Sequence, residues 1–350
     1  MQISGLAIAG YERVLRVEDE GSGYRAVIAI HNTALGPAVG GTRLWKYADL
    51  EAALEDALRL ARGMTYKNAL AGLPFGGGKS VLLVPEGAYD REELFRVHGR
   101  VVESLGGTYI TAEDVGTSTD DMEIVRRETK HVGGLKGASG DPSPRTARGV
   151  FRAMQAAARW KWGSDDLRGK TVAIQGCGHV GSSLASQLAQ AGAQVVVSDI
   201  DRKRAAAAAQ ECSGKVVESA EIYGVAADVF APCALGGVLN DETIAQLKVE
   251  MVVGAANNQL LDPQHGRKLQ ERGILYAPDY AANAGGVING CCLELLGWDL
   301  AATMRKIDAI YDTMLGIFEL AKGKDTTPAE AADRLAEKRF RPVANQGSAS

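Results

Sequence analysis

The chain has 350 residues, of which 46% are hydrophobic and 23% charged, and its net charge at neutral pH is −4. This length favours two domains, each with its own core, and the composition is ordinary for a globular protein in water. The slight acidity excludes the basic surface that nucleic-acid binding needs, and no apolar run approaches the ~20 residues that a membrane-spanning helix requires.

Strands and a long helix are the first elements that the sequence predicts. Strands are expected at residues 24–30 and, after a glycine-rich turn, within residues 36–45. Residues 51–71 carry apolar side chains at three- and four-residue steps, which predicts an amphipathic helix with Asp49 as its N-cap. Lys67 falls on the apolar stripe of this helix, so it either extends to water along the surface or points into a cleft.

Residues 76–78 are all glycine and stand directly before Lys79. The run resembles the end of a phosphate-binding loop, but that motif needs a glycine six residues before the lysine, where Leu73 stands. We therefore interpret the run as a glycine turn that allows close approach of backbone or ligand and leads into a buried strand at residues 80–84. A plain hairpin turn is the alternative.

The segment 133–144 is rich in glycine, serine and proline and is interpreted as the hinge into a second domain. Before it we expect a helix at 91–105, a strand at 108–115 that ends in Glu113 and Asp114, and a helix at 120–130. The expected domains are residues 1–132, joined by a C-terminal segment of about 328–350, and residues 133–327.

After a helix at 146–162, short β-branched apolar runs alternate with helical segments. The runs are TVAIQG, QVVVSD, DVFAPC, MVVGAAN and ILYAPD. This alternation predicts a parallel sheet with helices on both faces. The expected fold class is therefore α/β, with two domains separated by a cleft and a Rossmann-type doubly wound sheet in the second.

The first of these runs leads into a glycine motif and at once into a helix. The motif is G-x-G-x-x-G, formed by Gly176, Cys177, Gly178, His179, Val180 and Gly181. In this context it predicts a dinucleotide site whose pyrophosphate lies on the helix N-terminus. Asp199, at the end of the next strand, is expected to bind the ribose hydroxyls and to repel a 2′-phosphate, which favours NAD. Residues 202–204 are basic and keep NADP open as an alternative.

The five cysteines are odd in number and show no C-x-x-C spacing, and the five histidines show no zinc-binding spacing. No metal site is expected. The N-terminus lacks the features of a signal peptide, and a reducing cytoplasm is the expected compartment.

Long segments of the chain resemble the Glu/Leu/Phe/Val dehydrogenase family, most closely its leucine-specific branch. These segments are GPAVGGTRLW, ARGMTYKNALAGLPFGGGKS, YITAEDVGTS, GDPSPRTARGV, DVFAPCALGGVLN, GAANNQL and LYAPDYAANAGGVIN. The resemblance implies oxidative deamination of an apolar L-amino acid to a 2-oxo acid and ammonium, with hydride passing to NAD. A homo-oligomer with small-molecule partners is expected, and neither nucleic acid nor a membrane.

The resemblance also implies roles for individual residues. Lys79 would activate water, Asp114 would transfer the proton of the amine, and Lys67 would hold the substrate carboxylate. The other implied substrate-binding residues are Gly40, Gly41, Met64, Ala112, Asn257, Val287 and Gly290. The cofactor-binding residues that it implies outside the glycine motif and Asp199 are Arg43, Thr146, Ile200, Ala231, Pro232, Ala256, Asn257 and Asn258. Independently, two ammonium groups in one cleft lower each other's pKa, so Lys79 is able to act as a base near neutral pH.

Three alternative functions compete with this interpretation. A non-catalytic NAD-binding protein has no need of two lysines and an acid in one domain. A glutamate dehydrogenase needs a cation for the distal carboxylate, whereas the expected side-chain pocket is Val39, Met64, Ala112 and Val287. A phenylalanine- or tryptophan-preferring enzyme is favoured by Gly290, which stands within an expected helix that starts near Asn283. Glycine there either admits a packed neighbour or deepens the substrate pocket.

Overall fold

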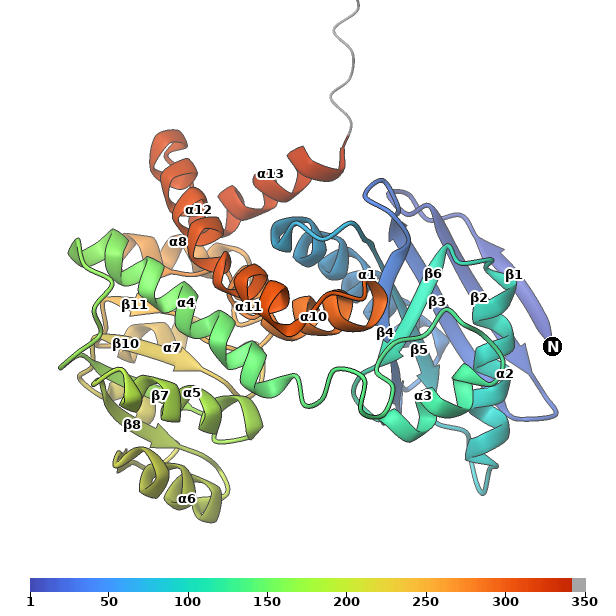
Figure 1. Ribbon diagram of the computed structural model, residues 1–350, viewed down its shortest axis with the longest axis horizontal. Coiled ribbons are helices and arrows are strands. Elements are labelled where there is room, and N and C mark those ends of the chain that lie inside the picture. Colours follow the sequence, from blue (N-terminus) through green and yellow to red (C-terminus); the bar gives the residue numbers. More distant parts are fainter. Residues whose placement is uncertain (342–350) are drawn as a thin grey trace, which may run out of the picture. The chain divides into compact units, whose positions relative to one another are not determined.

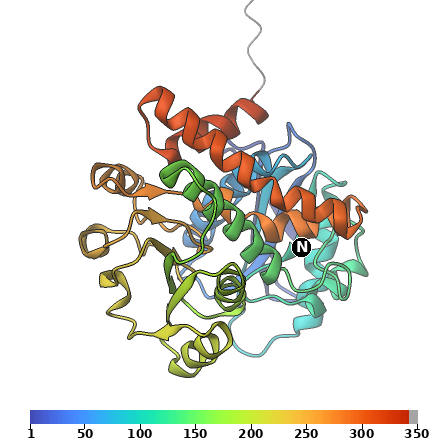
Figure 2. The same ribbon diagram turned by 60° about the vertical axis from the view of Figure 1, so that its left-hand side comes forward.

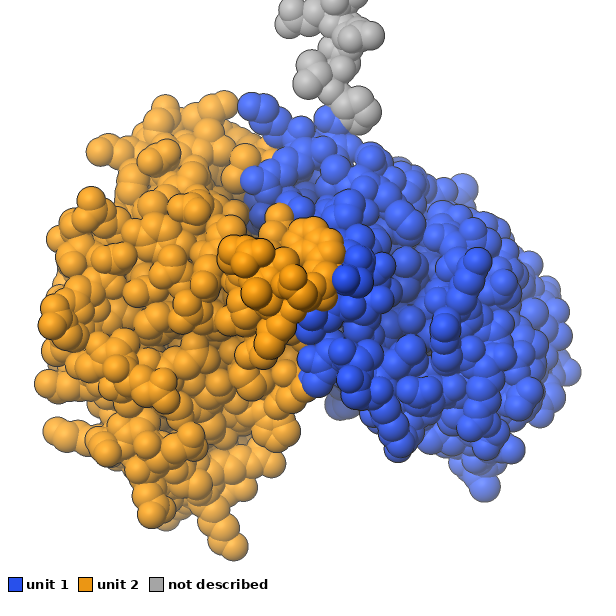
Figure 3. Space-filling view, viewed as in Figure 1, with its two compact units in different colours: residues 1–140, 290–297, 336–350 blue, residues 141–289, 298–335 orange. Residues whose placement is uncertain are grey.

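A computed structural model describes residues 1–341 of the chain (Figures 1 and 2). It divides into two compact units, which Figure 3 colours separately. The first unit consists of residues 1–140, 290–297 and those from 336 onward, and the second of residues 141–289 and 298–335.

These boundaries differ from the expected ones at 132 and 328. Residues 133–140 stay with the first unit because the Glu294 carboxylate of that unit binds them. Glu294 accepts hydrogen bonds from the backbone N–H groups of Gly134, at 2.6 Å, and Leu135, at 3.4 Å, and from the Ser139 hydroxyl. The part of the expected C-terminal segment that follows residue 341 lies outside the described residues.

The first unit is built on a six-stranded mixed sheet in the order β1-β2-β3-β5-β4-β6. Its strands are β1 (Gln2–Leu6), β2 (Arg13–Asp19), β3 (Tyr24–Asn32), β4 (Ala38–Trp45), β5 (Gly76–Leu83) and β6 (Tyr109–Glu113). β4 runs parallel to both β5 and β6 and lies between them, whereas the other pairs are antiparallel. The strands β1 and β2 were not predicted, because β1 is short and poor in β-branched residues and charged residues interrupt the apolar run of β2.

Helix α1 (Leu50–Ala71), which the sequence predicted at residues 51–71, packs on one face of this sheet. The Asp49 side chain accepts a hydrogen bond from Ala52 N, and Gly72 ends the helix in the left-handed conformation, with φ of 61°. Alanines on the buried side of α1 join a core with Val27 and Val81 of the sheet. The helices α2 (Arg91–Ser104) and α3 (Thr119–Arg126) contribute to a second core cluster with β2, β3 and β5.

The glycines of residues 76–78 lie within β5 and are fully buried, so their interpretation as a turn is wrong. The prediction that these glycines allow other backbone to approach closely is confirmed. A Cβ atom on Gly77 would lie 2.1 Å from the backbone nitrogen of Thr65 in α1, and one on Gly78 would lie 2.8 Å from the Tyr109 ring. The glycines therefore let a helix and an aromatic ring pack directly on the backbone of a central strand.

The second unit contains the predicted parallel sheet, in the order β12-β11-β10-β7-β8-β9. Its strands are β7 (Thr171–Gln175), β8 (Gln194–Ser198), β9 (Lys215–Val216), β10 (Val229–Pro232), β11 (Met251–Val252) and β12 (Leu275–Tyr276). Ala173 packs against the apolar cluster that includes Ile244 and Leu269, while its neighbours Val172 and Ile174 are buried on the opposite face. Both faces of the sheet are therefore covered, as predicted.

Helices α4 (Ser143–Trp162), α5 (His179–Gln190), α6 (Arg202–Cys212), α7 (Asp241–Gln246) and α8 (Gln264–Glu271) belong to this unit. The C-terminal helices are α11 (Leu300–Asp308), α12 (Ile310–Lys324) and α13 (Pro328–Phe340), of which α13 crosses into the first unit. Within residues 1–341 no helix combines the length and apolarity that crossing a membrane demands.

The helix expected from near Asn283 begins as α10 (Gly285–Gly290) and continues directly into the π-helix η2 (Cys291–Leu295). A separate short helix, α9 (Asp279–Ala282), precedes it. A Cβ atom on Gly285 would lie 2.0 Å from the carbonyl oxygen of Arg145, so α10 packs directly on the first turn of α4.

The glycines of α1 and β5 give a matched test of these packing arguments. We expect Gly77→Ala to lower the free energy of unfolding by about 1–3 kcal/mol or more, because backbone must move to admit the methyl group. Gly63→Ala lies within α1, where a Cβ atom meets no atom within 4 Å, and should raise it by up to about 1 kcal/mol. Urea unfolding of both variants beside the parent chain measures the two effects, and equal stability of all three proteins would refute the packing role.

Candidate active site

Lys79 and Asp114 meet in the first unit, although they come from different strands. Lys79 lies on β5 and Asp114 directly follows β6, and the Lys79 Nζ lies 2.6 Å from the Asp114 Oδ2. The Lys79 side chain is only 6% exposed. A buried ammonium and a carboxylate in direct contact are able to exchange a proton.

The glycines of β4 make this contact possible. A Cβ atom on Gly41 would lie 2.8 Å from the Asp114 Cβ, and one on Gly40 would lie 1.7 Å from the carbonyl oxygen of Gly78. Tyr109 donates a hydrogen bond from its hydroxyl to the carbonyl oxygen of Gly40 at 2.6 Å. The two glycines therefore have a packing function in this unit in addition to the substrate contact that the resemblance implies.

Burial and neighbouring charges set the protonation of the pair. Burial lowers the pKa of Lys79; the attraction of Asp114 opposes this, Arg43 adds to it, and the net direction is downward. Burial alone would raise the pKa of Asp114, but Lys79 and Arg43 outweigh it, so that this pKa also lies below its ordinary value. Arg43 is therefore a cation that lowers the pKa of Lys79, and the sequence did not suggest it for that effect.

Two other groups around Asp114 were not found from the sequence. Thr117 accepts a hydrogen bond from the backbone N–H of Asp114 at 2.9 Å through its Oγ1. Asp56, on α1, binds Arg43, whose Nη1 lies 2.8 Å from the Asp56 Oδ2. The contact of Asp56 joins α1 to β4, which no local sequence pattern predicts, whereas that of Thr117 is a local turn contact three residues from Asp114.

The remaining predicted residues of the first unit lie on α1, on the strands β4 and β6, and at the end of α10. Met64 and Lys67 flank Thr65, whose backbone packs on Gly77, and both are partly buried on α1. Ala112 pairs with Gly41 on the adjacent strand, and Val39 is buried on β4. Gly290 lies at the end of α10, and a Cβ atom there would meet no atom within 4 Å.

The glycine motif of the second unit forms the predicted turn between β7 and α5. Gly176 has φ of 98°, and a Cβ atom on Gly181 would lie 1.9 Å from the carbonyl oxygen of Gly176. Gly178 is the N-cap of α5 and gives it no side-chain hydrogen bond, and a Cβ atom on Gly178 would meet nothing within 4 Å. Gly178 thus leaves open space at the N-terminus of α5, whose first turn begins with His179 and Val180. This arrangement fits the pyrophosphate of a dinucleotide.

Asp199 lies beside this turn at the end of β8. Its Oδ2 accepts a hydrogen bond from Cys177 N at 2.7 Å and its Oδ1 one from Asp201 N at 2.8 Å. The next side chain, Ile200, is 95% exposed. Of the basic residues that follow, Arg202 pairs with Glu218 and Arg204 with Asp201.

The other predicted residues of the second unit cluster at the carboxyl ends of the parallel strands, where this fold class binds its ligands. Ala231 and Pro232 end β10, and Ala256, Asn257 and Asn258 follow β11. The Asn257 Oδ1 accepts a hydrogen bond from Asn283 at 2.8 Å. Thr146 lies in the first turn of α4, and Val287, which is partly buried, lies on α10.

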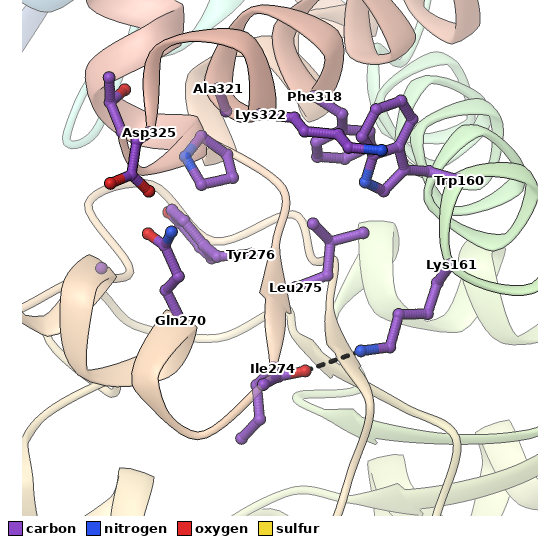
Figure 4. A pocket seen from close by; sticks show the side chains of 14 residues that line it. Trp160, Lys161, Gln270, Ile274, Leu275, Tyr276, Phe318, Ala321, Lys322 and Asp325 are labelled. Carbon is purple, nitrogen blue, oxygen red and sulfur yellow. Dashed lines mark hydrogen bonds between the residues drawn. The ribbon is translucent and has the colours of Figure 1, made fainter.

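A cavity of about 350 Å³ lies elsewhere in the second unit, beside the edge strand β12 (Figure 4). Trp160, Leu275, Tyr276 and Phe318 form its apolar walls. None of its lining residues is a predicted site residue. Among the described residues, no cluster of histidine, cysteine or carboxylate side chains is suited to a metal ion.

Comparison with known proteins places both units in one family. Residues 11–131 match the family model described as Glu/Leu/Phe/Val dehydrogenase, dimerisation domain, and residues 137–203 and 197–297 match that of Glutamate/Leucine/Phenylalanine/Valine dehydrogenase. Leucine dehydrogenase of Geobacillus stearothermophilus is 52% identical over 94% of this chain and 90% of its own. Valine dehydrogenase of Streptomyces albus is 49% identical over 95% of this chain and 92% of its own.

The solved structures agree. The crystal structure of L-tryptophan dehydrogenase from Nostoc punctiforme is 45% identical, with a TM-score of 0.85 over 95% of this chain and 96% of that one. Glutamate dehydrogenase from Peptoniphilus asaccharolyticus shares the fold at 23% identity, with a TM-score of 0.73 over 97% of this chain and 90% of that one. Identity near one half over nearly the whole length, in addition to two matching family models, shows that this chain belongs to the Glu/Leu/Phe/Val dehydrogenase family.

Proposed function

We propose that this chain, an amino acid dehydrogenase, oxidatively deaminates an apolar L-amino acid with NAD, reversibly. The amino acid, water and oxidised cofactor give the 2-oxo acid, ammonium, reduced cofactor and one proton. The observation that carries the proposal is the buried contact of 2.6 Å between Lys79 and Asp114 beside the glycines of β4. A panel of L-amino acids, tested for NADH formation at alkaline pH, examines it directly.

The residues of the first unit supply the acid–base chemistry. Lys67 would bind the substrate carboxylate, and Asp114 would take a proton from the substrate ammonium, since its lowered pKa keeps it ionised. Lys79, whose pKa is also lowered, would then act as the base that removes a proton from the attacking water. NAD, when bound, supplies the acceptor for the hydride from the substrate Cα.

Three features support NAD as the cofactor. The open space at Gly178 and the N-terminus of α5 suit the pyrophosphate, and Asp199 lies at the strand end where ribose hydroxyls bind in this fold class. Arg202 and Arg204, which kept NADP open, are both paired with carboxylates. These surface pairs are weak, so Asp199 is the main determinant.

An apolar substrate is supported by the residues that line the expected side-chain pocket. Val39, Met64, Ala112 and Val287 include no cation for a distal carboxylate, which disfavours glutamate. A preference extended to phenylalanine or tryptophan is supported by the open space at Gly290. The close packing that glycine permits in this region falls on Gly285 and Gly286, both against the start of α4, and leaves Gly290 without a packing neighbour.

We also propose that the chain forms a homo-oligomer and works in the cytoplasm. The family model that matches residues 11–131 is described as a dimerisation domain. The five cysteines, all within the described residues, form no disulfide. Light scattering after size-exclusion chromatography measures the oligomeric state.

Lys79→Ala should lower kcat by ~100-fold or more, which is the usual effect of removing a positioned acid–base group. Binding of NADH, followed by fluorescence titration, should be unchanged because the glycine motif lies in the other unit. Lys67→Ala should act mainly by raising KM for the amino acid. Lys136→Ala, which removes an exposed lysine of the same unit, is the control and should leave both constants as they are. A near-normal kcat for Lys79→Ala would end the proposed mechanism.

Asp199→Asn tests the choice of cofactor while it keeps the size of the side chain and an oxygen for Cys177 N. The parent enzyme should show a higher kcat/KM with NAD than with NADP. The variant should narrow that ratio by roughly tenfold, because the repulsion of the 2′-phosphate is removed. Equal kcat/KM for both cofactors in the parent enzyme, or an unchanged ratio in the variant, would show that Asp199 does not select the ribose.

Gly290→Val tests the depth of the substrate pocket. The new methyl groups enter open space, so the fold should tolerate them, and they should shorten the space for the substrate side chain. We expect the ratio of kcat/KM for phenylalanine to that for leucine to fall about tenfold or more, since valine adds three carbon atoms and even one methylene-sized group is worth about 1–3 kcal/mol in such a pocket. A constant ratio would mean that Gly290 does not face the substrate.

A further inference from the structure

The Arg43 guanidinium lies between two carboxylates of the first unit. Its Nε lies 3.2 Å from the Oδ2 of Asp114, and its Nη1 lies 2.8 Å from the Oδ2 of Asp56. Lys79 contacts the same Oδ2 of Asp114 at 2.6 Å. The Oδ2 of Asp114 therefore contacts both the Lys79 ammonium and the Arg43 guanidinium. Arg43 is in turn bound by Asp56.

Two further side chains, in addition to Arg43, form hydrogen bonds with the Asp56 carboxylate. The Tyr47 hydroxyl donates to its Oδ2 at 2.6 Å, and the Arg59 guanidinium donates to its Oδ1 at 2.7 Å. Burial would raise the pKa of Asp56, but these hydrogen bonds and charges outweigh it and keep the pKa below its ordinary value. The acid therefore remains an anion, and it gives the guanidinium a fixed partner on α1.

We propose that Arg43 is a positioning residue for the reaction: held by Asp56, it fixes the Asp114 carboxylate against Lys79 and keeps a second positive charge beside that pair. This inference rests on the proposed function. It assigns Arg43 to the acid–base pair of the first unit, in place of the cofactor contact that the family resemblance implied. Because its nitrogens already bind two carboxylates, its orientation is set within the first unit.

The expected effect on titration follows from the charges. The positive charge of Arg43 favours the anion of Asp114 and disfavours the cation of Lys79, so it lowers the pKa of both groups. The negative charge of Asp56 raises the pKa of Lys79, but this effect is weaker than the lowering by Arg43. Other titratable or charged groups on the elements around the pair include Tyr109 and Glu113 on β6, Tyr47 after β4, and Arg59 and Lys67 on α1. Arg43 therefore makes neutral Lys79 available at a lower pH.

The test is the pH dependence of kcat/KM for leucine in the parent enzyme, Arg43→Gln and Arg43→Lys. The parent activity should rise with pH as Lys79 loses its proton. Arg43→Gln should move this rising limb to higher pH by on the order of one unit, so that kcat/KM at a fixed pH on the limb falls roughly tenfold. Arg43→Lys keeps the positive charge but cannot contact Asp114 and Asp56 at the same time as arginine does. The rising limb of its pH profile should therefore move less than that of Arg43→Gln, while its kcat should still fall.

Controls separate this role from others. Arg100→Gln removes an arginine–carboxylate pair on α2 of the same unit and should leave the limb in place. If Arg43→Gln is too unstable to assay, the double variant Arg43→Gln/Asp56→Asn removes both charges and should still move the limb upward, though less. The Kd of NADH, measured by fluorescence, should not change in any of these variants.

Three results would decide against the inference or its basis. A lower kcat with an unmoved limb would mean that Arg43 only supports the fold. A weakened Kd of NADH with an unmoved limb would assign Arg43 to the cofactor instead. A parent enzyme that forms no NADH with any amino acid would refute the proposed function itself, which is distinct from either outcome.

Discussion

The contact between Lys79 and Asp114 crosses the strand β4, and it therefore restricts which side chains β4 is able to carry. Lys79 leaves β5 and Asp114 follows β6, while β4 lies between these two strands and pairs with both. Any side chain on Gly40 or Gly41 of β4 would overlap the backbone of a neighbouring strand or the Asp114 side chain. The contact between Lys79 and Asp114 therefore requires glycine at positions 40 and 41 in addition to the attraction between the two charges.

The same reasoning applies to helix α1, which carries Lys67. Its backbone at Thr65 rests on Gly77, and the Asn68 side chain donates to the carbonyl oxygen of Gly76 at 2.6 Å. The last turn of α1 contains no basic residue of its own. Arg339 of α13 instead donates to the carbonyl oxygens of Ala69 and Leu70, at 2.6 and 2.8 Å, and so satisfies groups that a helix end leaves unpaired. Lys67 is thus placed relative to β5 by contacts on both sides of it in the sequence.

The sequence predicted those parts of the structure that depend on local signals. The period and caps of α1, the alternation in the second unit and the turn at Gly176 each lie within a short stretch of chain. The glycines before Lys79 were misinterpreted because glycine commonly marks a turn, and the atoms that require it here belong to a helix. Asp56 was missed for a similar reason. It looks like any polar residue of α1 until Arg43 reaches it from β4.

Open space beside a glycine is weaker support for a ligand site than close packing is for a structural role. Gly316 and Gly323 of α12 also have nothing within 4 Å of a Cβ position, and no predicted site residue lies on that helix. Gly290 differs from them in its place in the chain. It ends α10 three residues after Val287, begins a π-helical turn of the kind often found at functional sites, and is where the chain re-enters the first unit. A helical glycine costs about 1 kcal/mol relative to alanine. No atom within 4 Å of a Cβ position at Gly290 offsets that cost, which is the reason for proposing that this glycine acts in substrate selection.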